Sequence, residues 1–513
     1  MAREWLNDAI FYEIYPQSFL DTNGDGIGDF QGIIDKLDYI CDLGCNAIWM
    51  NPCFKSPFGD AGYDVEDFYE AAPRYGTNAD LKRLFDEMHK RGMHILLDLV
   101  AGHTAITHKW FKESMKDEIN PYTDRYVWSD TEWGGDRHYN WLCGISERRG
   151  AAMVNFFAHQ PALNYGFYEI KEPWQQPVDA PGPQSTLEEL KNIMRFWLSM
   201  GCDGFRVDMA HSLVKNDPES KGTIALWKNV RDFLNREFPE AVLVSEWGEP
   251  QKSLEGGFHM DFLLHFGPSH YNDLFRCEEP FFSRRGKGNA YEFVKKYESL
   301  QAETAGKGFI CIPSGNHDMD RLARSLSGSE LKVAFGFLMS MPGVPFIYYG
   351  DEIGMRYVEG LKSVEGGYLR TGSRSPMQWD DTTNAGFSQA PSERLYIKMD
   401  PDPNRPTVKK EMEDSHSLLR EVERLTKLRK EHKALGNKGD VKFIYAKEKT
   451  YPLAYIRSYE DEKILVVVNP SYKDASFESD LMGSELIHSI GDNATMDGST
   501  ITAPAGSISF IKL

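Results

Sequence analysis

Four acidic residues of this chain stand at or near the ends of short apolar runs. Asp98 lies in HILLDLV, Asp208 ends GFRVD, Glu246 follows VLVS, and Asp318 follows IPSGNH. A carboxylate in such a place needs a reason, because removing its charge from water is costly. Several carboxylates that meet at one site can act as acid, base or nucleophile. Glycoside hydrolysis uses two of them, one as nucleophile and one kept protonated as general acid.

An arginine accompanies one of these acids. Arg206 precedes Asp208 by two residues. Side chains alternate along a strand, so the two share one face. We therefore expect the positive charge of Arg206 to hold Asp208 ionised.

The elements that position these residues follow a regular alternation. Eight strand-like runs lie near residues 11, 47, 96, 206, 243, 261, 311 and 347, and helical stretches separate most of them. This pattern predicts an α/β fold, a (β/α)8 TIM barrel, with the acids at the carboxyl ends of the strands. We expect the barrel to comprise residues 1–103 and 183–434. An inserted subdomain (104–182) follows the third strand, and a C-terminal all-β sandwich covers 435–513.

Composition limits the partners and the setting. The 513 residues carry 58 Lys and Arg against 77 Asp and Glu, so the formal charge is 58 − 77 = −19. This excess of acidic residues argues against nucleic acid as a partner. Seven cysteines without a Cys-x-x-Cys pair indicate reduced thiols and a cytoplasmic protein. The apolar run 333–350 contains Pro342, Gly343 and Pro345, so we expect no membrane span. The oligomeric state, monomer or homodimer, stays open.

Five motifs in order carry a resemblance to a known family. They are DLVAGH (98–103), QPALN (160–164), GFRVDMAH (204–211), SE (245–246) and NHD (316–318). With them the chain resembles the α-amylase superfamily of retaining glycoside hydrolases, glycoside hydrolase family 13, over essentially its whole length. It is most similar to the branch that contains oligo-1,6-glucosidases, α-glucosidases and trehalose synthases.

The resemblance implies a role for each matching residue. Asp208 would be the nucleophile, Glu246 the general acid/base, and Asp318 the third carboxylate, which binds sugar hydroxyls. The implied substrate contacts are Tyr63, Asp64, His103, Arg206, His317 and Arg374. Among these, Asp64 would pair with Arg374, grip the non-reducing end of a small α-glucoside and close the pocket.

Three positions depart from the usual family pattern. Gly102 replaces an Asn that binds calcium in many secreted amylases, so that calcium site is not expected here. Ala162 replaces an Asp of the usual QPDLN. Met209 and Ala210 replace the Val–Ile typical of α-1,6-specific enzymes, which favours α-1,4 or relaxed linkage preference.

A second motif, DTNGDGIGD, has the odd-position oxygen donors of a calcium loop. The donors are Asp21, Asn23, Asp25, the Ile27 carbonyl and Asp29. The twelfth position is Gly32 rather than Glu, so the loop is not an EF-hand. Members of the same branch carry a similar loop. We predict a structural Ca²⁺ site there, and no organic cofactor.

Each interpretation has a simpler alternative. The acids could form structural ion pairs, Arg374 could be a loop salt bridge, and the 21–29 loop could be a turn without metal. The aromatic residues of the insertion could serve packing alone: Trp141, Phe156, Phe157 and Trp174. Three functions are therefore compared. The first is a retaining α-glucosidase, and the second a transglycosylase or isomerase that forms trehalose or sucrose isomers. The third is a non-catalytic relative, like the heavy chains of amino-acid transporters.

Overall fold

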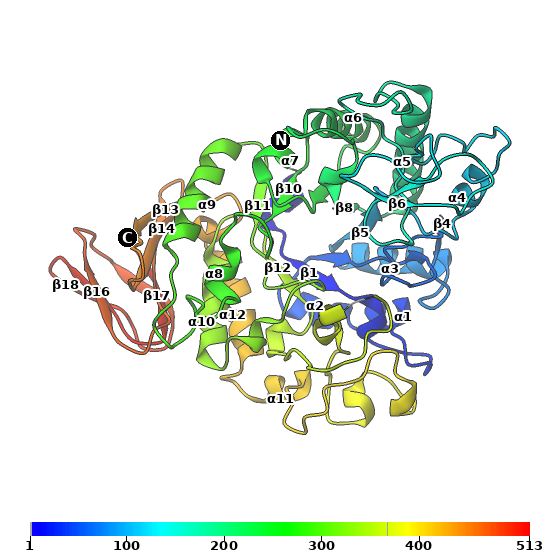
Figure 1. Ribbon diagram of the computed structural model, residues 1–513. Helices are drawn as coiled ribbons and strands as arrows, with labels where there is room; N and C mark the ends of the chain where they lie inside the picture. The colour runs from blue at the N-terminus through cyan, green and yellow to red at the C-terminus, as the bar shows by residue number, and fades with distance from the viewer. Residues whose placement is uncertain (1–2, 367) are drawn as a thin grey trace.

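The computed structural model describes residues 3–366 and 368–513 and contains an eight-stranded parallel barrel (Figure 1). Its strands are β1 (Phe11–Ile14), β2 (Ala47–Met50), β5 (His94–Val100), β8 (Gly204–Asp208), β9 (Val242–Ser245), β10 (Met260–Phe262), β11 (Phe309–Cys311) and β12 (Phe346–Tyr348). They pair in the order β11-β10-β9-β8-β5-β2-β1-β12. A parallel bridge between Pro313 and Phe346 joins the two ends of this sheet. All eight predicted strand positions are confirmed.

Alternation along the strands sorts their side chains into two groups. One row, which includes Phe11, Leu96 and Val244, packs inside the barrel. The other row, which includes Ile48 and Val207, packs against the surrounding helices. Every second residue of a strand belongs to the inner row. Towards the carboxyl ends of the strands, the residues of this row change from apolar to charged. The barrel therefore has an apolar floor and a charged mouth, as sites of this fold require.

Helices follow most barrel strands. They are α1 (Phe30–Asp35), α2 (Leu37–Asp42), α3 (Asn78–Lys90), α5 (Pro181–Met200), α6 (Lys221–Glu237), α7 (Pro250–Glu255), α8 (Tyr271–Phe275), α9 (Tyr291–Thr304), α10 (Ser329–Ser340), α11 (Val408–Glu413) and α12 (Leu418–Glu431). Helices α1 and α2 are separate, because Lys36 between them leaves helical geometry at φ −113° and ψ 6°.

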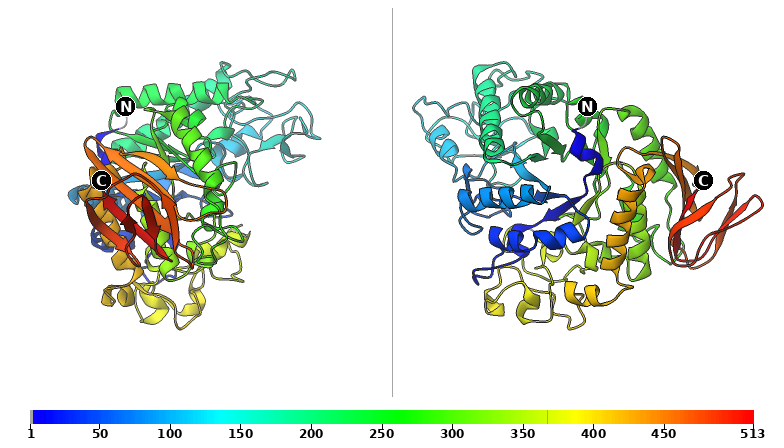
Figure 2. Two further views of the ribbon diagram at one scale, coloured as in Figure 1. Left: turned by 90° about the vertical axis from the view of Figure 1, so that its left-hand side faces the viewer. Right: turned by 180° about the vertical axis from the view of Figure 1, so that it is seen from behind.

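Two additions flank the barrel. Between β5 and α5 the insertion holds α4 (Lys109–Ser114) and a hairpin of β6 (Asn140–Leu142) and β7 (Ala152–Val154). A smaller hairpin, β3 (Phe54–Lys55) and β4 (Asp67–Ala71), follows β2. After α12 the chain forms two antiparallel sheets. Their strands are β13 (Asp440–Tyr445), β14 (Leu453–Tyr459), β15 (Glu462–Asn469), β16 (Ala475–Glu478), β17 (Glu485–Ile490), β18 (Thr495–Asp497), β19 (Thr500–Ala503) and β20 (Ser507–Lys512). Figure 2 shows the insertion and the C-terminal sheets on opposite sides of the barrel.

The run 333–350 is the end of α10, a turn and strand β12, as its prolines predict. Within the described residues, no helix has both the length and the apolar character needed to cross a bilayer. All seven cysteines are free thiols.

Candidate active site

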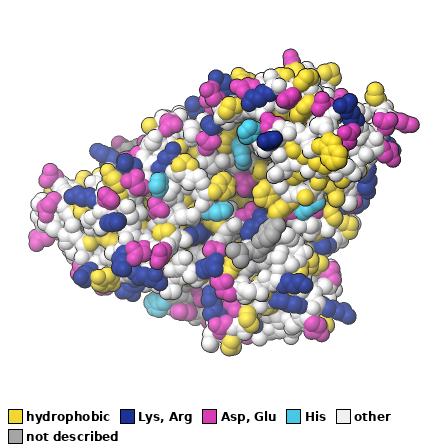
Figure 3. Space-filling model, in the orientation of Figure 1, with side chains coloured by type: hydrophobic (Ala, Val, Ile, Leu, Met, Phe, Trp, Pro, Cys, Tyr) yellow, Lys and Arg dark blue, Asp and Glu magenta, His cyan; other side chains and the backbone are white. Residues whose placement is uncertain are grey.

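A cavity of about 290 Å³ lies at the charged mouth of the barrel. Its walls include all three predicted catalytic carboxylates together with Tyr63 and His103. Figure 3 shows histidine side chains near the centre of this face, over the barrel strands. The structure thus brings together side chains from four strand ends and one loop that are far apart in the sequence.

Arg206 is the hub of the first half of the site. Its side chain is 2 % exposed. One nitrogen, Nη1, lies 2.8 Å from Asp98 Oδ1 and 3.1 Å from Asp208 Oδ1. The other, Nη2, lies 2.9 Å from Glu246 Oε2. The two carboxylates that glycoside hydrolysis would use are therefore held by one rigid cation.

The pKa of Asp208 reflects opposing influences. Arg206 lowers it, as the sequence predicts, but burial and the nearby Glu246 carboxylate outweigh Arg206 and raise the pKa of Asp208 well above its usual value. Two carboxylates on one guanidinium repel each other when both are charged, so the pair favours holding one proton.

Asp98 has a structural place in this arrangement. It is 1 % exposed and does not line the cavity. Its Oδ2 accepts hydrogen bonds from Trp49 Nε1 at 3.1 Å and Tyr63 Oη at 3.0 Å. Asp98 thus fixes Tyr63 and Arg206 in position from beneath the cavity.

His317 anchors the second half of the site. Its Nδ1 donates to Glu13 Oε1 at 2.9 Å, and its Nε2 donates to Tyr63 Oη at 2.7 Å. Nε2 also lies 3.2 Å from Asp318 Oδ2. Burial alone would lower the pKa of His317, but the carboxylates of Asp318 and Glu13 outweigh it and raise the pKa to about 9. The ring is therefore an imidazolium at neutral pH.

Asp318 is surrounded by cations. Its Oδ1 accepts from Arg370 Nη1 at 2.7 Å and from Arg374 Nη2 at 2.8 Å. Burial alone would raise the pKa of Asp318, but His317 and the two arginines hold it well below the usual value. Asp318 is thus an ionised acceptor, suited to bind sugar hydroxyls.

The pair that closes the cavity is not the predicted one. Asp64 is fully buried and does not line the cavity. It accepts from Ser56 Oγ and from the N–H groups of residues 59 and 60, so it folds its own loop. The pairing of Asp64 with Arg374 is therefore wrong. Instead, Asp60 Oδ1 lies 3.3 Å from Arg370 Nη2, and both residues line the cavity.

Arg374 still belongs to the site, but as a support. It is fully buried and makes an ion pair with Glu365 at 3.2 Å. Its Nε donates to the backbone oxygen of His317 at 2.8 Å. The sequence offered a signal for both missed residues, since Asp60 lies three residues before Tyr63 and Arg370 four before Arg374.

His103 has the opposite charge state from His317. Its Nε2 donates to the Tyr63 carbonyl and its Nδ1 accepts from Asn155 Nδ2, each at 3.1 Å. Burial lowers the pKa of His103 to about 3. His103 is therefore a neutral hydrogen-bonding group in the wall of the cavity.

The environment of Gly102 explains one departure from the family pattern. A Cβ at Gly102 would lie 2.8 Å from Asn155 Nδ2. The Asn155 amide therefore occupies the space that a side chain at 102 would need. Its Oδ1 accepts from the ammonium of Lys215 at 3.1 Å, and burial lowers the pKa of Lys215 to about 8.

The turn after the nucleophile position places Met209 in the cavity wall. Met209 has φ 42° and ψ 43°, a left-handed conformation that is uncommon for a residue with a side chain. Its N–H donates to Glu246 Oε2 at 2.9 Å. The strained turn thus helps to orient Glu246. Phe156, His211, His265 and Phe266 complete the rim.

The predicted calcium loop has a different internal arrangement. Asp21 accepts three N–H groups of the loop, from Asn23, Gly24 and Gly26. Asp29 accepts from Thr22 and from the N–H of Gly32, which caps α1. Asn23 and Asp25 each accept the N–H two residues on, the latter from Ile27.

In this arrangement the carboxylates of the loop accept hydrogen bonds from nearby backbone N–H groups. In the part of the chain that the structure describes, no three His, Cys, Asp or Glu side chains are grouped to hold a metal ion. Ca²⁺ binding stays a prediction from the sequence pattern.

Comparison with known proteins decides the family. The model of the α-amylase catalytic domain matches residues 13–438. The chain belongs to the α-amylase family. It is thus a glycoside hydrolase, and its relatives support glucosidase or transglycosylase activity.

Two curated relatives and two solved structures illustrate the breadth of the family. The chain is 32 % identical to an oligo-1,6-glucosidase of Parageobacillus thermoglucosidasius, covering 93 % of this chain and 92 % of that one. It is 34 % identical to the trehalose synthase/amylase TreS of Mycobacterium tuberculosis, covering 84 % and 76 %.

Among solved structures, the trehalulose synthase MutB of Pseudomonas mesoacidophila has a TM-score of 0.82 at 26 % identity, covering 100 % of both chains. An isomaltulose synthase of Erwinia rhapontici, solved with its natural substrate sucrose, has a TM-score of 0.82 at 25 % identity over 99 % of both chains.

Proposed function

We propose that this chain is a retaining α-glucosidase that releases glucose from short α-glucosides. One observation carries the proposal. Asp208 and Glu246 hold the two ends of one buried guanidinium, in a cavity that the Asp60–Arg370 ion pair borders. A carboxylate pair this close suits a nucleophile and an acid in a retaining mechanism.

The roles of the two carboxylates are those that the family resemblance implies. In the proposed mechanism Asp208 attacks the anomeric carbon while Glu246 gives its proton to the leaving oxygen. The glycosidic bond breaks and a glycosyl ester forms on Asp208. Glu246 then takes a proton from water, whose oxygen attacks the same carbon and releases α-glucose. Asp318, which lines the cavity, would accept hydrogen bonds from the sugar hydroxyls throughout, and His317 would hold Asp318 and Tyr63 in place from beneath.

The size of the cavity supports cleavage at the chain end. A cavity of about 290 Å³ with a charged pair in its wall favours one terminal glucose unit over a chain that passes through. Met209, which lines the cavity beside the nucleophile, leads us to expect maltose to be cleaved at least as fast as isomaltose.

A second candidate is a transglycosylase or isomerase on the same intermediate. Some relatives support it, since they include a trehalose synthase/amylase, an isomaltulose synthase and a trehalulose synthase. The acceptor of the glycosyl group would then be a sugar hydroxyl instead of water.

Proton NMR during incubation with maltose, isomaltose, sucrose or trehalose distinguishes the two candidates. We expect α-glucose to appear first and mutarotate later. Formation of a new disaccharide with little free glucose would favour the transglycosylase. Absence of any reaction with all four sugars would reject the proposed substrates.

A further inference from the structure

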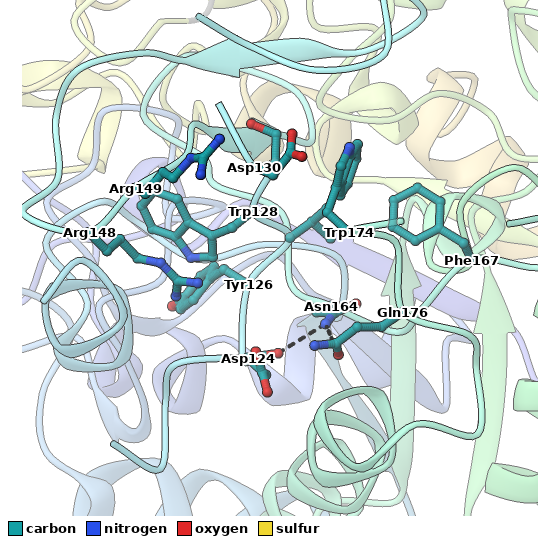
Figure 4. A pocket seen from close by; sticks show the side chains of 12 residues that line it. Asp124, Tyr126, Trp128, Asp130, Arg148, Arg149, Asn164, Phe167, Trp174 and Gln176 are labelled. Carbon is teal, nitrogen blue, oxygen red and sulfur yellow. Dashed lines mark hydrogen bonds between the residues drawn. The ribbon is translucent and has the colours of Figure 1, made fainter. Parts of the chain in front are cut away.

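A second cavity, of about 270 Å³, lies in the inserted subdomain. Figure 4 shows Trp128 on one side of it, Trp174 on the opposite side, and Asn164 with Gln176 below. None of the residues that line the active-site cavity lines this one. Its volume is close to the 290 Å³ of the active site, so it has room for a ligand of the same size.

Aromatic rings form two of its walls and are held rigidly. Trp128 stacks on Phe111, with ring centroids 5.9 Å apart and planes 8° apart. Trp174 packs against the edge of Phe167 at 5.6 Å. Such rings combine an apolar face with a polar N–H, which suits the C–H faces and hydroxyl groups of a sugar.

Polar groups also line the cavity. Trp128 is 7 % exposed, and its Nε1, which is shielded from solvent, has no acceptor among the described residues. Below it, Asn164 Nδ2 donates to Gln176 Oε1 at 3.0 Å, which fixes both amides in place.

The charges around the cavity favour a neutral ligand. Two acids, Asp124 and Asp130, are balanced by Arg148 and Arg149. Arg148 is committed to the fold, since its Nη1 donates to the backbone oxygens of residues 114 and 123 and its guanidinium lies over Trp128. The other lining cation, Arg149, is exposed at the rim, and Asp130 lines the same cavity and offsets its charge. The cavity therefore has no net positive charge to attract an anion.

One short segment links this cavity to the active site. Gln160 Nε2 donates to Asp60 Oδ2 at 2.8 Å, in the wall of the active-site cavity. Four residues later, Asn164 lines the second cavity. Four steps of extended chain span at most about 14 Å, so this short segment connects a residue that bonds Asp60 with a residue that lines the second cavity.

We propose that this second cavity binds one hexose unit of an oligosaccharide without cleaving it. It holds the aromatic and amide groups of a sugar site but no pair of carboxylates on a shared cation. The choice of sugar as ligand rests on the proposed function. A site of this kind would keep oligosaccharide bound to the same chain as the active-site cavity.

The test uses full-length protein with the Asp208→Asn exchange, which stops turnover, labelled with 5-fluorotryptophan and titrated with maltotriose. Fluorine NMR resolves the eleven tryptophans of the chain. Trp49 reports on the active site, because its Nε1 bonds Asp98. Trp128 and Trp174 report on the second cavity. Single Trp→Phe variants assign the three signals.

We expect the signals of Trp128 and Trp174 to shift along one saturable curve, with a midpoint different from that of Trp49. Trp174→Ala should abolish the Trp128 shift and leave the Trp49 shift unchanged. Trp128→Phe removes the N–H and part of the ring. It should weaken binding, so that the Trp174 signal reaches its midpoint at a higher maltotriose concentration. The control is Trp133→Ala, at a 90 % exposed tryptophan of the same subdomain outside the cavity.

The remaining outcomes separate this inference from the proposed function. A shift of Trp49 without a saturable shift of Trp128 and Trp174 overturns the second site and leaves the α-glucosidase intact. Shifts of Trp128 that survive Trp174→Ala also overturn it. No shift of any of the three signals contradicts both proposals.

Discussion

The two cavities of this enzyme have nearly the same volume but opposite organisation. In the active site, each acid shares a cation with another group, as Asp208 and Glu246 share Arg206. These side chains project from strand ends and their loops. The cavity of the insertion is built from irregular segments, with aromatic walls and a buried indole N–H for which the described residues offer no acceptor. Charges held in advance by a rigid frame are what catalysis needs, whereas binding a neutral ligand needs only shape and a few hydrogen bonds.

The largest expected effect tests the chemistry of the first cavity. Asp208→Asn keeps the shape of the side chain but removes the nucleophile, so kcat should fall by about 10⁴-fold or more. Steady-state hydrolysis of maltose measures this, with circular dichroism to confirm folding. A folded variant with near-normal kcat would show that the carboxylate pair is not the catalytic one.

The next effect tests which ion pair closes the cavity. Arg370→Gln removes charged hydrogen bonds to Asp60 and Asp318. Each is worth about 1.5–3 kcal/mol, so kcat/KM should fall by roughly 10- to 150-fold or more. The control is Asp64→Asn, which alters only bonds within its own loop and should change KM by less than about threefold. A larger loss for Asp64→Asn than for Arg370→Gln would restore the pair predicted from the sequence.

A pH profile tests the charge state of His317. Its pKa of about 9 means that it donates from both nitrogens below that pH and loses one donor above it. Activity should therefore fall as the pH rises through about 9. Glu13→Gln removes one of the two carboxylates that raise this pKa. The alkaline limb of kcat/KM should then move to lower pH. A purely structural role of Glu13 would change the melting temperature and leave that limb in place.

A smaller effect sharpens the contrast between the cavities. Trp174→Ala should leave kcat for maltose within about twofold of the wild type, because Trp174 contributes no group to the active-site wall. A disaccharide assay with Trp133→Ala in parallel measures this. A tenfold loss of kcat for Trp174→Ala alone would mean that the insertion takes part in catalysis.

The smallest effect concerns the 21–29 loop. If it binds Ca²⁺ as its pattern predicts, EDTA should lower the melting temperature by a few degrees and Ca²⁺ should restore it, through mass action on the folded state. Asp25→Ala should remove this response. The same melting temperature in Ca²⁺ and in EDTA would show that the loop is held by its own hydrogen bonds.

Local patterns in the sequence were sufficient for the barrel and for the main acids. A strand covered on both faces is a continuous apolar run, and its signal needs no distant partner. The acids Asp208, Glu246 and Asp318 could be predicted because each follows such a run. The irregular composition of 104–182 likewise indicated an insertion before any contact was known.

Contacts between residues that are far apart in the sequence could not be predicted from such local patterns. Asp60 and Arg370 are 310 residues apart, and Asp64 lies in the same short segment as Asp60. Either acid fits the pattern, and only packing decides which side chain turns into the cavity. The same holds for Glu13, whose pairing with His317 spans 304 residues.

By itself, then, the sequence determined the strands, their order and the acids at their ends, because these follow from local periodicity and burial. The tertiary structure decided which acids share a cation, which histidine is charged and where the second cavity lies. These properties depend on distances of 3–4 Å between segments hundreds of residues apart, at which burial and neighbouring charges set the pKa of each group.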